Sequence, residues 1–175
     1  MLDSAQFGVP QSRRRLFVIC DREQDPPEVV PRRRKKPRTA ASIIDTNGTY
    51  EFVPLKTPKR AERTLESAKR AIKTVGKKNP FLIVYYGTDG GGGWQTLRVP
   101  LRTVTTLDRF AVVKPTSDGH QMRMLQVPEL KRAMGLPQTF RLKHGTRRDQ
   151  IKLLGNGVCP AVMRSIVTAL MRKGN

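Results

Sequence analysis

The sequence predicts a mixed α/β fold, and three observations support this prediction. Residues 16–20 and 81–86 are short apolar runs rich in β-branched and aromatic side chains, which are typical of buried strands. Apolar residues from Ala61 to Val75 recur every three or four positions, which is the period of one helical face. With 37% of its 175 residues apolar, the chain can form the core of one domain or of two small ones.

The first half of the chain is predicted to contain one strand, a linker and one helix. Residues 16–20 are expected to form a buried strand. The sequence Asp25-Pro26-Pro27 then breaks the chain, so residues 22–38 are expected to form a loop or linker. A helix is predicted over residues 59–75, and Gly76 is suited to end it.

The second half is predicted to contain further strands and then helices. Strands are expected at three places, residues 81–86, 96–105 and 109–113. Short helices are expected at residues 129–134, with Pro128 in the first turn, and at 147–153, capped by Thr146. A last helix is expected to begin at Pro160 and to end at Gly174.

The formal charge of +20 indicates a polyanionic partner, which is either nucleic acid or an anionic membrane surface. The charge is concentrated, since residues 56–78 carry nine Lys or Arg against two Glu. No lipid-anchor signal and no apolar run of about 20 residues is present, so nucleic acid is favoured over a membrane. The alternative is a basic protein that merely needs a partner, as ribosomal proteins do.

Cysteine and histidine usage argues against two classes of protein. The two cysteines, Cys20 and Cys159, form no CxxC pair, which disfavours a fold built on disulfides. With only two histidines as well, no structural metal site is expected. The first residues lack the basic and apolar regions of a signal peptide, so a cytoplasmic location is expected.

Three segments, taken in order, resemble cytosine-5 DNA methyltransferases. Residues 7–19 read FGVPQSRRRLFVI and are similar to the eighth motif of that family, GVPQxRxR followed by an apolar strand. Residues 123–140 resemble the ninth motif through the spacing of Arg123, Glu129, Arg132, Gly135-Leu136-Pro137 and Phe140. Residues 154–162 read LGNGVCPAV and resemble the tenth motif, GNxVxPxV. The chain therefore resembles the C-terminal part of such an enzyme.

The resemblance implies an organisation in four parts. Residues 1–20 and 146–175 are expected to be pieces of a Rossmann-like methyltransferase domain. Residues 21–115 are expected to form a smaller, strand-containing target-recognition region with a basic linker and helix. Residues 116–145, which carry the ninth motif, are expected to act mostly as scaffold, with Arg123 and Glu129 tying the motif together.

The eighth motif carries the candidate catalytic residues Gln11, Arg13 and Arg15. They alternate, so on an extended segment they point the same way and offer an amide and two guanidinium groups to phosphates or a base edge. The alternative is a solvated basic turn. By resemblance, Arg15 contacts the flipped target cytosine and Gln11 and Arg13 order the site, while Arg14 points elsewhere.

The tenth motif carries the candidate cofactor residues Asn156, Gly157 and Val158. A tight turn before a helix exposes backbone N–H groups that suit a small polar ligand, although it can equally be an ordinary turn between helices. By resemblance, these three residues line the S-adenosylmethionine pocket, and the helix that begins at Pro160 covers it.

The middle of the chain is expected to contact double-stranded DNA. Candidate residues are Arg98, Arg102, Thr103 and Arg109, because arginine can pair with guanine in the major groove. For each of them, a phosphate contact or a solvated charge is the alternative. The helix over residues 59–75 is expected to hold phosphates, and the glycine run at residues 90–93, next to Trp94, to let backbone approach DNA.

The sequence also departs from the family. It contains no FxGxG cofactor loop, no Pro-Cys nucleophile segment and no Glu-Asn-Val segment. Methylation of cytosine C5 requires a cysteine thiolate to attack C6, and neither Cys20 nor Cys159 is placed for that role. We therefore expect this chain to be inactive alone and to need an N-terminal portion or a complementary chain. The alternative is a non-catalytic DNA- or RNA-binding module, or a degenerate remnant.

Overall fold

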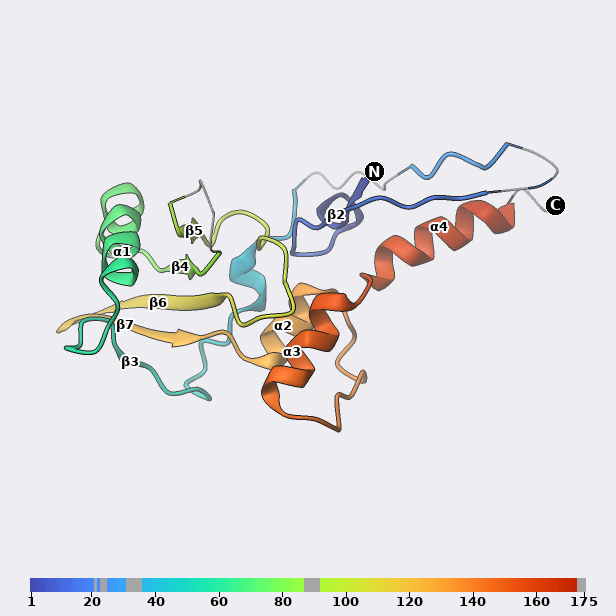
Figure 1. Cartoon of the computed structure of the whole chain (residues 1–175). Helices are drawn as coiled ribbons and strands as arrows, with labels where there is room; N and C mark the ends of the chain where they lie inside the picture. The colour runs from blue at the N-terminus through green and yellow to red at the C-terminus, as the bar shows by residue number, and fades with distance from the viewer. Residues whose placement is uncertain (21, 23–24, 31–35, 87–91, 173–175) are drawn as a thin grey trace.

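The computed structural model describes residues 1–20, 22, 25–30, 36–86 and 92–172, and it has the mixed α/β fold that the sequence predicts. It contains a five-stranded antiparallel sheet in the order β3-β7-β6-β4-β5, at the end of the molecule opposite the helix α4 (Pro160–Arg172) (Figure 1). The strands are β3 (Val53–Pro54), β4 (Phe81–Val84), β5 (Trp94–Thr96), β6 (Phe110–Thr116) and β7 (Gly119–Met124).

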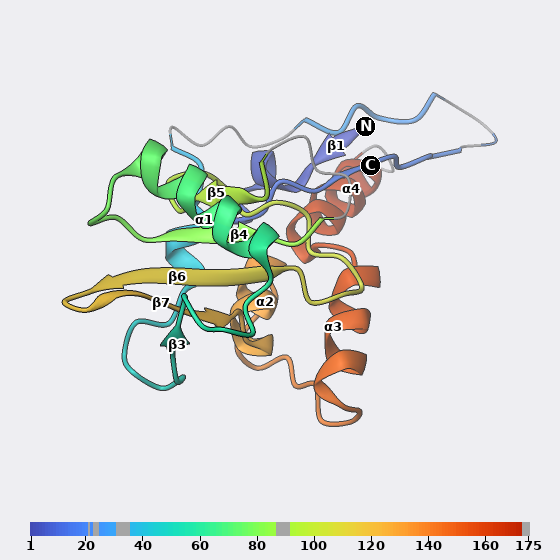
Figure 2. The same ribbon diagram turned by 60° about the vertical axis from the view of Figure 1, so that its left-hand side comes forward.

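Both faces of this sheet are buried, which explains why β4 and β6 are apolar without alternation. One face packs on the helix α1 (Glu62–Val75), which lies across β4 and β5 (Figure 2). The side chains on this face are Phe81, Ile83, Ala111, Val113 and Met122, against Ala68 and Ala71 of the helix. The opposite face, with Leu82, Val84, Phe110 and Val112, joins a larger core with the other helices.

The helices form close to where the sequence predicts them. The helix α1 begins at Glu62 and ends at Gly76, whose φ of +88° favours glycine. The helix α2 (Val127–Ala133) has a proline in its first turn. The helix α3 (Arg147–Asn156) is capped by Thr146, and α4 (Pro160–Arg172) begins at the predicted proline. The predicted end at Gly174 lies outside the described residues.

The N-terminal segment folds into a small unit against the C-terminal helices. The strand β1 (Leu2–Asp3) pairs antiparallel with β2 (Arg14–Arg15), and the short helix η1 (Ser4–Phe7) lies between them. A second short helix, η2 (Ala40–Ile43), packs beside α2.

The prediction of a buried strand at residues 16–20 is wrong. Pairing stops at the register Leu2↔Arg15, and in the described part of the chain no strand pairs with the following residues. An apolar run cannot form a sheet without a neighbour, so Leu16 and Val18 are left 70% and 74% exposed. Cys20, expected at the end of this strand, is exposed as well.

The strand predicted at residues 96–105 is also wrong, apart from its first residue. Beyond Thr96 the chain turns, and Leu101 forms only an isolated parallel bridge with Gln11. Pro100 cannot donate to a ladder, which disfavours a continued strand. The strand β7 was not predicted; it pairs with β6 across residue 115, so the sheet continues past the expected boundary of the target-recognition region.

Among the residues that the structure describes, one stretch, Arg147–Met171, is long and apolar enough to cross a membrane. In the fold it is divided into α3 and α4, which are separated by Gly157, Val158 and Cys159. Its apolar residues Ile151, Leu154, Val162 and Ile166 lie in the core. These four residues pack inside the protein, and the expectation that the chain does not bind membranes stays a prediction.

Candidate functional site

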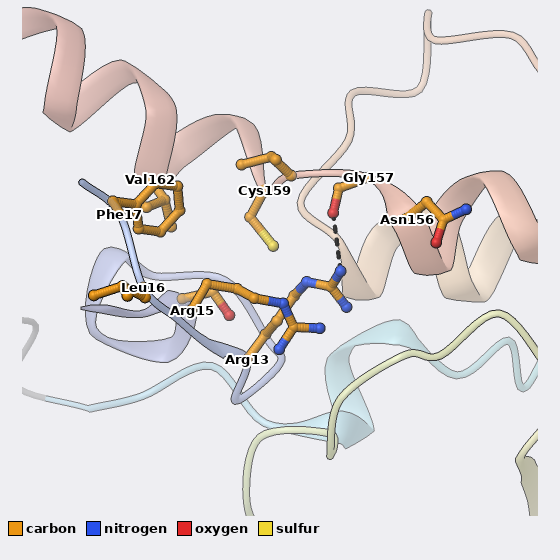
Figure 3. A pocket seen from close by; sticks show the side chains of 10 residues that line it. Arg13, Arg15, Leu16, Phe17, Asn156, Gly157, Cys159 and Val162 are labelled. Atoms are coloured by element: carbon orange, nitrogen blue, oxygen red, sulfur yellow. Dashed lines mark hydrogen bonds between the residues drawn. The ribbon is translucent and has the colours of Figure 1, made fainter. Parts of the chain in front are cut away.

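A cavity of about 220 Å³ brings the eighth and tenth motifs together. It lies where the segment around β2 meets the turn between α3 and α4 (Figure 3). The residues that line it are Ser4, Arg13, Arg15, Leu16, Phe17, Asn156, Gly157, Val158, Cys159 and Val162. The two motifs lie more than 130 positions apart in the sequence, and only the fold makes them neighbours.

Arg13 joins the two motifs through hydrogen bonds to backbone carbonyls. Its Nη2 donates to the carbonyl oxygens of Gly155 at 2.6 Å and Gly157 at 3.1 Å, and its Nη1 donates to Val104 at 2.7 Å. Burial lowers the pKa of Arg13, and the nearby charge of Arg15 lowers it further. An arginine nevertheless stays protonated at neutral pH, so a positive charge is held at the wall of the cavity.

Gln11 and Arg15 take different positions. The buried Gln11 amide donates to the carbonyl oxygen of Ala133 at 3.3 Å and accepts from the Val104 N–H at 2.6 Å. Arg15 is exposed at the mouth of the cavity and donates to the carbonyl oxygen of Arg14 at 2.7 Å. Gln11 therefore fixes the segment, while Arg15 has its guanidinium beside the cavity.

Cys159 also lines the cavity, but its environment does not favour a nucleophile. The side chain is buried, and burial raises the pKa of the thiol, an effect only partly offset by a hydrogen bond with Ser4 and by Arg13 and Arg15. A neutral thiol is a weak nucleophile. Cys20 is exposed and does not line this cavity.

A family model described as C-5 cytosine-specific DNA methylase matches residues 1–172. This chain belongs to the C-5 cytosine-specific DNA methylase family. The family-level prediction is confirmed, and with it the assignment to DNA cytosine-5 methyltransferases, which use S-adenosylmethionine. Comparisons with curated proteins and with solved structures gave no match.

In this methylase chain, the tenth-motif residues differ in how they face the cavity. The Gly157 carbonyl points to Arg13, whereas the exposed Asn156 side chain is directed away from Cys159 (Figure 3). Val158 is half-exposed. The preceding Gly155 packs so tightly that a Cβ there would lie 2.3 Å from the backbone of Thr105, which fixes the position of the turn.

The size of the cavity fits one part of S-adenosylmethionine. Pockets that enclose a whole drug-sized ligand have volumes of about 300–1,000 Å³. At about 220 Å³, this cavity has room for a fragment of the cofactor, next to Gly157 and Val158.

The ninth motif forms a buried ion pair, as predicted. The two Nη atoms of Arg123 donate to the two carboxylate oxygens of Glu129 at 2.8 and 2.7 Å. Glu129 also accepts from the backbone N–H groups of Gln126 and Asp45. Sequence reasoning missed the additional ion pair of Arg132 with Asp45, at 2.6 Å, because nothing in the spacing links these residues.

The four predicted DNA-binding residues lie in the segment between β5 and β6, and none of them lines this cavity. Arg98 is exposed, and Arg102 is partly buried. The Thr103 hydroxyl donates to the Ser12 carbonyl at 3.1 Å and so has a structural contact. Arg109 lines a second cavity, of about 390 Å³, together with Arg63 and Arg70 of α1, which sequence reasoning did not single out.

Proposed function

We propose that this chain supplies target recognition, the target-cytosine contacts and part of the S-adenosylmethionine pocket of a DNA (cytosine-5)-methyltransferase. The nucleophilic cysteine would come from an N-terminal portion or a complementary chain. The proposal rests on the hydrogen bonds from Arg13 to the Gly155 and Gly157 carbonyl oxygens, which join the eighth motif to the tenth beside one cavity. Arg15 lines the same cavity, and its charge and N–H donors suit the polar edge of an extruded base.

The reaction explains why a further cysteine is needed. Cytosine C5 is a poor nucleophile until a thiolate adds to C6, which makes C5 electron-rich. After transfer, loss of the C5 proton and expulsion of the thiolate restore the aromatic ring. Cys20 lies on an exposed segment outside the cavity, and Cys159 is held as a neutral thiol, so neither fits this role.

The chain's own residues would prepare the site. Arg13 fixes the Gly157 carbonyl, and Gln11 fixes the segment that carries Arg15. When bound, S-adenosylmethionine supplies the electrophilic methyl group, and Gly157 and Val158 would cover part of it. Apolar side chains that remain exposed after β2 and on α4, at Leu16, Val18 and Val167, support docking of another part of the enzyme.

Methyl transfer in a reconstituted system tests the proposal. Labelled methyl transfer from S-adenosylmethionine to duplex DNA would be measured with this chain, with a candidate N-terminal chain, and with both. We expect transfer only with both chains. Robust transfer by this chain alone, abolished by Cys159→Ser, would overturn the proposal. Transfer by the partner alone, unchanged by this chain, would favour a degenerate remnant.

Salt dependence tests the double-stranded DNA partner. Each phosphate that the protein neutralises adds about 0.9 to the slope of log K against log salt concentration. We expect affinity for duplex DNA to fall steeply between about 50 and 200 mM salt, given the charge of +20. Binding without methyl transfer in the complete system would favour the non-catalytic module. We propose the cytoplasm as the site of this activity.

A further inference from the structure

We propose that the second cavity is a phosphate-binding site, separate from the pocket around Arg13. It lies between the first half of α1, the end of strand β4 and the two glycines that precede β5. That the phosphate belongs to DNA rests on the proposed function, whereas phosphate binding itself does not. The lining residues include Arg63, Thr64, Ser67, Arg70, Tyr85 and Arg109.

The charge of the cavity favours an anion. Three arginines line it, and no Asp or Glu is among its described lining residues. Arg70 approaches Glu66 at 4.0 Å, and both side chains are half-exposed, so this pair is weak. The first turn of the 14-residue helix α1 also lies at the cavity, and helix N-termini carry partial positive charge.

Arg109 provides an independent sign of a missing ligand. Its Nη1 donates to the Tyr85 carbonyl oxygen at 2.6 Å. Its Nε is buried and has no acceptor in the part of the chain that the structure describes. Buried donors without an acceptor are rare and costly, and they commonly mark an ion or water. A phosphate has oxygens enough to accept from several N–H groups of one guanidinium.

Arg70 is held in position rather than freely mobile. Its Nε and Nη2 donate to the Gly92 carbonyl oxygen at 3.3 and 3.1 Å, and Nη2 also donates to the Ser67 hydroxyl at 3.2 Å. Close packing continues at Gly93, where an added Cβ would lie 2.5 Å from the Ser67 hydroxyl oxygen. The cavity wall is thus already formed, which reduces the entropy lost on binding.

The single tryptophan of the chain can report on this cavity. A Cβ added at Gly92 would lie 3.4 Å from the Trp94 indole and 3.7 Å from Nε of Arg70. Trp94 therefore stands beside the lining residues. The charge of an anion bound beside Arg70 is expected to change the emission of this one fluorophore.

The experiment uses the full chain and four probes: inorganic phosphate, thymidine 5′-monophosphate, thymidine and a short DNA duplex. We expect a saturable change in Trp94 fluorescence with phosphate and the monophosphate, but none with thymidine. Arg109→Gln should weaken phosphate binding about tenfold or more, because charge-assisted hydrogen bonds are the strong ones. The matched control is Lys143→Gln, which removes one charge from the exposed segment between α2 and α3 and should leave phosphate binding unchanged.

The titration with the DNA duplex shows whether the phosphate that binds this cavity comes from DNA. If the duplex is the natural source, Arg109→Gln should also lower duplex affinity and reduce the salt slope by about 0.9. Phosphate binding with unchanged duplex affinity would overturn DNA as the source. Absence of any phosphate-dependent signal, in a chain whose circular dichroism shows it folded, would overturn the site. Failure of methyl transfer would affect only the proposed function, because phosphate titration does not require it.

Discussion

The two most deeply buried arginines, Arg13 and Arg123, solve the same physical problem differently. They are 6% and 5% exposed, so both guanidinium groups have lost most of their hydration. Arg123 meets a carboxylate with two parallel hydrogen bonds and lies near the faces of Tyr50 and Phe52. Arg13 meets three backbone carbonyls, and no carboxylate forms an ion pair with it in the described residues.

The difference separates a structural element from a functional one. The Arg123 charge of β7 is cancelled by the Glu129 carboxylate of α2, so removing either partner would leave an uncompensated buried charge. The Arg13 charge is only solvated by dipoles and stays available beside the cavity. A buried charge without a counter-ion costs stability, and such costs are commonly found at functional sites.

The largest loss of stability is expected from Glu129→Ala. This substitution leaves Arg123 buried without its carboxylate and removes the acceptor of two backbone N–H groups. Breaking a buried pair in this way costs about 3–5 kcal/mol. Urea unfolding would measure the change, with Glu129→Gln as the milder variant. A loss under about 1 kcal/mol would contradict the structural importance assigned to this pair.

Arg13→Met should lower the free energy of unfolding less than Glu129→Ala does, but it should reduce methyl transfer more. It leaves neutral carbonyl groups without donors, at a cost of about 1–3 kcal/mol. The turn that contains Gly157 would no longer be fixed to the eighth motif, so methyl transfer in the complete enzyme should fall strongly. Equal effects of Arg13→Met and Glu129→Ala on both stability and transfer would remove the distinction between the two arginines.

Arg15→Ala should separate stability from activity completely. The side chain is exposed, so the free energy of unfolding should change by no more than about 0.5 kcal/mol. Methyl transfer should fall at least about tenfold if the guanidinium contacts the target base. Asn156→Ala is the comparison, and it should raise the concentration of S-adenosylmethionine required. Near-normal transfer by Arg15→Ala would exclude the base contact.

The smallest effect concerns pH and the other end of α3. Hydrogen bonds from the Thr146 hydroxyl and backbone N–H lower the pKa of Asp149. A lowered folded-state pKa stabilises the protein above the unfolded value of about 4, and this contribution is lost as the pH falls through the folded value. Thermal unfolding from pH 6 to 3 should show this loss in the unmodified chain and a smaller one in Asp149→Asn. The same pH dependence of the unfolding temperature in both proteins would contradict a stabilising role for the Thr146–Asp149 cap.

Local signals predicted the local structure well. Thr146, Pro128 and Gly76 mark helix ends because their effect depends only on neighbouring residues. The pairing of Arg123 with Glu129 was also predictable, since the two belong to one motif. The apolar run at residues 16–20 misled, because a strand depends on a partner that the run itself does not specify.

Contacts between distant residues could not be predicted. The cavity shared by Arg63 and Arg109 joins a helix to a loop 46 positions later, and no spacing rule connects them. The strand β7 was missed because it is mostly polar, and its apolar Met122 packs only when β6 and α1 are in place. The roles of Gln11 and Arg13 in ordering the site were expected from resemblance, but their carbonyl partners were not.

The bond between Arg13 and Gly155 spans 142 positions, and this has a consequence for synthesis of the chain. At about 5–20 residues per second, the ribosome needs roughly ten seconds or more to make the acceptor after the donor has formed. During that time the N-terminal segment has neither the turn that binds Arg13 nor the Ala133 carbonyl that binds Gln11. The sheet can fold first, and the cavity can close only after nearly the whole chain has been translated.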